Sequence, residues 1–161
     1  MSVTFGPEFK TTGRFTIKSW NDAAGDFVPF AGPFASYDEA ELNFLTACAA
    51  HGVDTLDAHI SVEVAYPNAP EVNMANTRAM DLLVAMDLDP EGLCGGEDAE
   101  VFHARVLVAL AQDRDDAEVP GFRDGNAYYG GRREGYVTER LEQLLEVAEF
   151  ARAKGLSVTW G

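Results

Sequence analysis

Polar and apolar residues alternate in three segments of the chain, 14–20, 59–66 and 156–160. A period of two predicts β-strands with one buried face. A further strand is predicted over 26–30, directly after a cluster of turn residues, and Pro29 indicates that it lies at a sheet edge. Strands with one polar face favour an antiparallel or mixed sheet over a doubly wound parallel one.

Four segments have the apolar spacing or start signals of helices. Ser36 and Glu39 form a capping box, so the first helix should begin there and end near His51. Asn76 is the predicted N-cap of a short second helix. In that helix the residues expected to face inward are Met80, Leu83 and Val84.

The last two predicted helices cover 97–112 and 134–154. Both place apolar residues at helical spacing, and Gly155 supplies a left-handed C-terminal position for the second. The element order is therefore β-β-α-β-α-α-α-β. This order predicts one α+β domain over 1–161, a two-layer fold with a small antiparallel or mixed sheet of about four strands and helices packed on one face.

Charge is unevenly distributed along the chain. Residues 36–118 contain eighteen acidic residues against three arginines, which accounts for the whole net charge of -15. Direct binding to nucleic acid or to an anionic membrane surface is not expected, because both require clustered Lys and Arg. Two explanations remain open: a solubilising surface, or an acidic face that binds a basic surface of another protein.

The remaining composition favours a cytoplasmic protein. Cys48 and Cys94 are too few for a disulfide framework and are expected to be reduced thiols. The first residues lack the basic start and apolar stretch of a secretory signal. No apolar run approaches the ~20 residues that span a bilayer.

Four potential metal ligands fall within nine residues: His51, Asp54, Asp57 and His59. All are of types that bind transition metals, but their spacing matches no known motif. The alternative is a solvated connection between a helix and a strand. No metal or other cofactor is predicted.

The segment 112–135 has no clear periodicity, and irregular stretches of this length are often functional. Arginines and glycines before a helix can hold a phosphate or carboxylate, and adjacent tyrosines can add stacking. The candidate ligand-binding residues are Arg123, Tyr128, Tyr129, Arg132 and Arg133. The alternative is a mobile loop whose arginines pair with the acidic middle of the same chain.

Three short motifs carry a resemblance to a known group of proteins: Asn73-Met74-Ala75-Asn76, Leu93-Cys94-Gly95, and the closing stretch from Gly135-Tyr136 to Trp160-Gly161. Over about residues 58–161 the chain resembles small proteins of unknown function from actinobacteria and from their phages and mobile elements. The resemblance implies a phage or accessory gene product in a bacterial cytoplasm. It implies no activity and no site residues.

Two functional hypotheses follow. The first is a non-enzymatic accessory module that binds a basic protein, in its sharpest form a DNA mimic that occupies a basic groove. The alternative is a small enzyme or metabolite-binding domain with an anion site in the Arg123–Arg133 loop. No common catalytic motif is present, which favours the first. Open sheet edges would also allow a homo-oligomer.

Overall fold

The computed structural model describes residues 2–112, 116–125 and 127–161, with only the backbone of 124 and 127–129. The chain forms two compact units. Unit 1 comprises Met1–Glu8 and Asn68–Gly161, and unit 2 comprises Phe9–Pro67. Unit 2 is therefore an insertion in the sequence of unit 1.

Unit 1 contains an antiparallel four-stranded sheet with the order β5-β1-β9-β6. Phe5 lies opposite Val72 on one neighbouring strand and opposite Trp160 on the other. The four strands are β1 (Ser2–Pro7), β5 (Val72–Ala75), β6 (Gly95–Asp98) and β9 (Ser157–Trp160).

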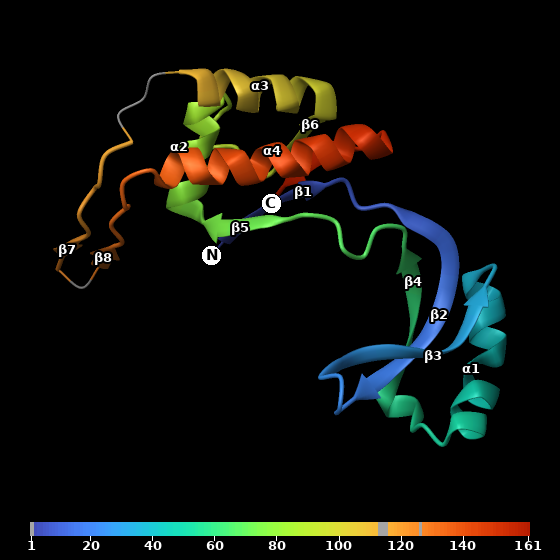
Figure 1. The fold of residues 1–161 in the computed structure, drawn as a ribbon. Helices are drawn as coiled ribbons and strands as arrows, with labels where there is room; N and C mark the ends of the chain where they lie inside the picture. Colours follow the sequence, from blue (N-terminus) through green and yellow to red (C-terminus); the bar gives the residue numbers. More distant parts are fainter. Residues whose placement is uncertain (1, 113–115, 126) are drawn as a thin grey trace. The chain divides into compact units, whose positions relative to one another are not determined.

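Three helices pack on one side of this sheet (Figure 1). They are α2 (Asn76–Ala85), α3 (Ala99–Ala111) and α4 (Tyr136–Lys154). Alternate strand residues point into the layer between sheet and helices, so Val72 and Met74 are buried while Asn73 between them is exposed. A two-stranded hairpin, β7 (Phe122–Asp124) and β8 (Ala127–Tyr129), also belongs to unit 1.

Unit 2 contains a three-stranded antiparallel sheet with β2 in the centre. One α-helix packs against its strands, and Ile17 from β2 and Ala40 and Cys48 from the helix are buried. The elements are β2 (Thr11–Asn21), β3 (Asp26–Phe34), α1 (Tyr37–His51), the 3-10 turn η1 (Thr55–Asp57) and β4 (Ala58–Val64).

The start of α1 follows the predicted capping box with one change. The Ser36 hydroxyl accepts a hydrogen bond from the Glu39 N–H (3.2 Å), as expected. The Glu39 carboxylate accepts from the N–H of Ala35 (2.9 Å) rather than from that of Ser36. Gly52 ends the helix with a φ of 66°, a left-handed conformation that glycine adopts without steric cost.

The α+β class, with small antiparallel sheets and helices on one face, is confirmed. The four predicted strands all exist, but they belong to two sheets. The first three form the sheet of unit 2, with β3 at an edge as Pro29 indicated. The last, β9, pairs with β1 and β6, which the sequence did not predict.

The strand β6 has the sequence Gly-Gly-Glu-Asp and carries no apolar residue, so it has no periodic signal. β6 is a strand because it pairs with β9, and its first position, Gly95, requires a glycine. A Cβ added to Gly95 would lie 2.6 Å from the Trp160 ring. The Trp160 indole N–H in turn donates to the carbonyl of Gly92 (3.0 Å).

Two expectations for α2 are wrong. The N-cap is Ala75, and Asn76 is the first helical residue, whose side-chain oxygen is buried without a hydrogen-bond partner in the described part of the chain. Met80 and Val84 are exposed. Leu83 is buried as expected, and the buried residues lie at the i, i+3, i+4, i+7 positions of one face: Ala79, Leu82, Leu83 and Met86.

Within the described ranges, no helix combines the length and the apolar character needed to cross a lipid bilayer.

Candidate functional site

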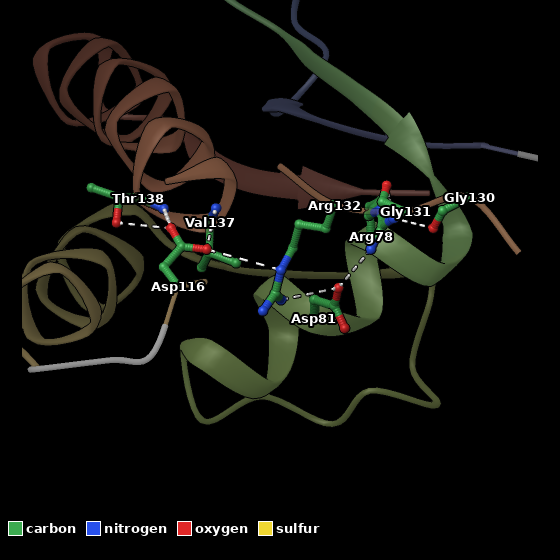
Figure 2. Close-up of polar contacts among 8 residues, drawn as sticks. All are labelled: Arg78, Asp81, Asp116, Gly130, Gly131, Arg132, Val137 and Thr138. Carbon is green, nitrogen blue, oxygen red and sulfur yellow. Dashed lines mark hydrogen bonds and ion pairs between the residues drawn. The ribbon is translucent and has the colours of Figure 1, made fainter. Parts of the chain in front are cut away.

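Arg132, a predicted ligand-binding residue, lies in a polar cluster of unit 1 (Figure 2). Its side chain is only 17% exposed, and its guanidinium is 3.6 Å from the Asp81 carboxylate and 3.9 Å from that of Asp116. The backbone is fixed as well, because Arg132 and Val119 exchange hydrogen bonds of 2.6 and 2.7 Å. Arg132 thus connects the 112–135 segment to α2.

Arg78 on α2 is the second cation of the cluster, and the sequence did not single it out. Its guanidinium lies 3.4 Å from the Asp81 carboxylate, one helical turn further on. It also donates to the backbone carbonyls of Gly130 and Gly131. These contacts hold the two glycines against the helix, as Figure 2 shows.

Asp116 caps the N-terminus of α4 from a distant position in the sequence. Gly135, the N-cap residue, has no side chain to accept hydrogen bonds. The Asp116 carboxylate accepts instead from the N–H groups of Val137 (3.2 Å) and Thr138 (3.0 Å) and from the Thr138 hydroxyl (3.1 Å). Its backbone carbonyl accepts from the Gly135 N–H (3.0 Å). These bonds satisfy donors that a helix start leaves unpaired.

The same contacts determine the acidity of Asp116. Burial acts to raise the pKa of this carboxyl, since it disfavours the charged form. The hydrogen bonds from Thr138 and Val137, together with the Arg132 guanidinium, outweigh burial and hold the pKa below its ordinary value. Asp116 therefore carries a negative charge next to Arg132 at neutral pH.

The cluster contains two guanidinium groups and two carboxylates, so its formal charge is zero. Arg132 pairs with Asp81 and Asp116, both from the acidic middle of the chain, as the alternative interpretation of this segment expected. Arg133 pairs with Glu139 of α4, and Arg123 is exposed on β7. The side chains of Tyr128 and Tyr129 lie outside the described residues. An anion site in this segment stays a prediction.

Replacing Asp116 with alanine should lower the free energy of unfolding by about 0.5–2 kcal/mol at pH 7, the usual cost of losing an N-cap. A carboxyl with a lowered folded-state pKa stabilises above its unfolded pKa, and this contribution is lost as pH falls through the folded value. The difference between wild type and variant should therefore disappear in acid. Urea unfolding at several pH values measures this difference, and replacement of the exposed Glu118 with alanine is the control. A difference that does not depend on pH would contradict the role of the Asp116 charge.

The four potential metal ligands occupy separate environments in unit 2. The His51 ring packs on Phe30 (centroids 5.3 Å apart), and the His59 ring packs on Phe27 (4.7 Å). Asp54 accepts a hydrogen bond from the Leu56 N–H (2.9 Å) and so caps η1, which includes Asp57. Within the described residues, no three His, Cys, Asp or Glu side chains are grouped as a metal site would require.

Helix α1 presents an apolar and acidic surface that sequence reasoning did not identify. Leu42 and Leu45 are 84% and 69% exposed. Asp38 precedes Leu42 by four residues and Glu41 precedes Leu45 by four, so all four side chains share one face of the helix. We call these residues the acidic leucine face. Most exposed apolar residues occur singly, whereas two leucines one turn apart form a contiguous patch.

A depression lies beside the acidic leucine face, between α1 and β4. Its volume is about 520 Å³, and it is lined mainly by apolar side chains. The lining residues are Tyr37, Glu41, Phe44, Leu45, His59 and Ile60. Leu45 and Glu41 belong to both features, so the face and the depression form one continuous surface.

Comparison of the chain with models of protein families, with curated proteins and with solved structures finds no match. The resemblance to proteins of actinobacteria and their phages therefore stays a prediction.

Proposed function

We propose that the protein is a binding module that docks a basic, partly apolar segment of another protein on unit 2. The observation that carries this proposal is the acidic leucine face of α1, where two largely exposed leucines lie beside two carboxylates. Removal of a leucine side chain from water contributes about 1.5–3 kcal/mol. A partner that covers Leu42 and Leu45 thus gains part of the free energy that offsets the freedom lost on association.

The charge of unit 2 supports a basic partner. Phe9–Pro67 contains eight acidic residues and three basic ones, and α1 alone contains Asp38, Glu39 and Glu41 with no Lys or Arg. Complementary charge speeds encounter and disfavours acidic partners. The depression beside Leu45 supplies a place for one large apolar side chain, the usual anchor of a protein interface.

The polar cluster of unit 1 argues against the alternative function, an anion site in the arginine-containing segment 112–135. Its arginines are neutralised within the chain, so an anionic ligand would have to displace Asp81 or Asp116 from Arg132. Since displacement of an internal ion pair lowers the net gain of ligand binding, a protein ligand on unit 2 is the better-supported function.

Substitution of both exposed leucines tests the proposal. Leu42→Gln with Leu45→Gln should weaken binding of the partner at least tenfold, which corresponds to a loss of about 1.4 kcal/mol. The side chains are exposed, so the fold should remain. The matched control is Asn43→Gln with Ala50→Gln, two exposed positions on another side of α1.

The partner is first captured from a bacterial lysate at low and high salt, and then titrated with each variant by calorimetry. We expect a stoichiometric partner that is released by salt, retained by the control and lost by the leucine variant. A partner that binds the leucine variant as tightly as the wild type, or whose affinity does not change with salt, would show that this surface is not the binding site. Absence of any captured partner also counts against the proposal.

A further inference from the structure

Strand β4 forms one edge of the sheet of unit 2, and in the part of the chain that the structure describes no strand pairs with its outer side. Just past its end, the N–H of Ala65 donates to the Lys10 carbonyl (2.9 Å), toward the neighbouring chain segment that leads into β2. Backbone N–H groups alternate in direction along a strand. Those of Ile60, Val62 and Val64 therefore point outward, away from β2.

The two edges of this sheet differ in how they resist further pairing. On β3, Pro29 and Pro33 lack an N–H, and the register with β2 shifts between Phe15 and Lys18. Prolines and bulges are the usual protection of an edge strand. β4 has seven residues, no proline, and a regular one-to-one register with β2 from Ala58 to Val62. It is the unprotected edge.

The sheet edges in unit 1 are less suited to pairing with another chain. β5 and β6 have four residues each, and β5 leads directly into α2. Short edge strands offer few backbone groups to a partner. The length, regularity and lack of proline of β4 therefore distinguish it among the edges of both sheets.

We propose that the partner segment binds as an additional β-strand along the outer edge of β4. This inference rests on the proposed function and specifies how the segment is recognised. Side chains of an added strand alternate between the two faces of the sheet. Every second one lies on the same face as Ile60, and so meets the depression that Phe44 and Leu45 line. Glu41, also in the lining, favours a Lys or Arg two positions from the apolar anchor, on the same face of the added strand.

A second copy of the chain is a less suitable occupant of the same edge. Pairing of two β4 strands would place two units 2 side by side, each with eight acidic and three basic residues. Two units of the same net charge repel each other, which disfavours their association. An extended basic segment gains both the backbone hydrogen bonds and the complementary charge, which is the mode known as β-augmentation.

Synthetic peptides test strand addition without altering the protein. The parent probe is the seven-residue peptide Lys-Thr-Val-Thr-Lys-Thr-Val with blocked ends, which places its Lys and Val side chains on one face of a strand. Two further peptides carry N-methyl groups on alternate residues, the first peptide along one edge of the extended chain and the second along the other edge. Methylation removes the backbone N–H donors of that edge and leaves the side chains unchanged. Calorimetric titration should show that one N-methylated peptide binds like the parent and the other binds at least tenfold more weakly. Equal affinity of all three peptides, or no binding of the parent, overturns the proposal.

Amide hydrogen exchange locates the pairing. In the presence of the parent peptide the amides of Ile60, Val62 and Val64 should exchange at least tenfold more slowly. Those of Ser61 and Glu63 already face β2 and should not change. The exchange rates of the three outward amides could stay unchanged while the leucine double variant still loses peptide binding. That result would reject strand addition and retain the proposed function. If the outward amides exchange slowly without peptide and the protein has a dimeric mass in solution, the edge binds a second copy of the chain. That result would also reject the proposal.

Discussion

Replacement of Phe102 with alanine is expected to lower the free energy of unfolding of unit 1 by about 3–5 kcal/mol. Phe102 lies on α3 and is fully buried. Its ring is 6.1 Å from that of Trp160, which stacks on Phe5 at 6.0 Å. Truncation removes the apolar contacts of the ring and leaves a cavity in a close-packed layer, so both the transfer and the cavity contributions are lost.

Phe122→Ala provides the matched control, since it removes the same atoms from a side chain that is 59% exposed. Trp160 reports on unit 1 by fluorescence when Trp20, the other tryptophan of the chain, is replaced with phenylalanine. Urea unfolding in this background gives both values. Equal losses for the two variants would mean that the layer between sheet and helices is not the stabilising core of unit 1.

Ile17→Ala is expected to lower the free energy of unfolding of unit 2 by about 2–5 kcal/mol. Ile17 is fully buried in the central strand β2, opposite Ala31 on β3 and Ile60 on β4. Few residues of unit 2 are buried to this degree, so little neighbouring structure is present to fill the space. A loss of this size is a large fraction of the stability of a small domain.

Leu56→Ala removes as many carbon atoms as Ile17→Ala from a side chain that is 91% exposed, and it should change stability by less than about 0.5 kcal/mol. Trp20, in unit 2, reports unfolding when Trp160 is replaced with phenylalanine. A similar loss for Leu56→Ala and Ile17→Ala would contradict the assignment of Ile17 as the centre of the unit 2 core.

The two experiments together decide whether 1–161 is a single domain, as its length predicts. If Phe102→Ala shifts the unfolding of both tryptophan reporters, the units unfold cooperatively and form one domain. If each substitution shifts only the reporter of its own unit, the chain contains two independently stable domains.

Local signals in the sequence predicted the elements that depend on local interactions. The capping box at Ser36 fixes the start of α1, and the alternation over 59–64 corresponds to β4. The helical spacing of apolar residues over 134–154 predicted α4, on which Leu141 and Leu144 are buried. In each case the residues that make up the sequence pattern also make up the helix or strand. The element can therefore be predicted without knowledge of a partner distant in the sequence.

Elements that depend on a distant partner gave no such signal. β6 exists because β9 pairs with it, and α4 is capped by Asp116, which lies nineteen positions before Gly135 in the sequence. The alternation over 156–160 predicted β9 itself, but no local pattern indicates that β9 pairs with β6 or that Asp116 caps α4. The arginine-containing segment was open to two interpretations. The sequence does not distinguish an arginine that pairs with an acidic residue of the same chain from an arginine that binds an anionic ligand. Only the positions of Asp81 and Asp116 distinguish them for Arg132.

The acidic leucine face could not be inferred for a similar reason. Apolar residues occur on all sides of α1, among them Ala40, Leu42, Leu45 and Cys48. A helix of this composition is compatible with burial of any face. The single layer of three strands in unit 2 covers the side with Ala40 and Cys48 and leaves the leucines exposed.

The position of unit 2 between β1 and β5 has a consequence for the folding pathway. These strands pair directly, so the chain must close a loop of roughly sixty residues before unit 1 can form. The hydrogen bond between Ala65 and Lys10 shows that folded unit 2 brings its own ends together. Prior folding of unit 2 shortens the loop to about ten residues and lowers its closure entropy by about 1.5 kcal/mol. We therefore expect unit 2 to fold first and to serve as a preformed turn that speeds the nucleation of unit 1.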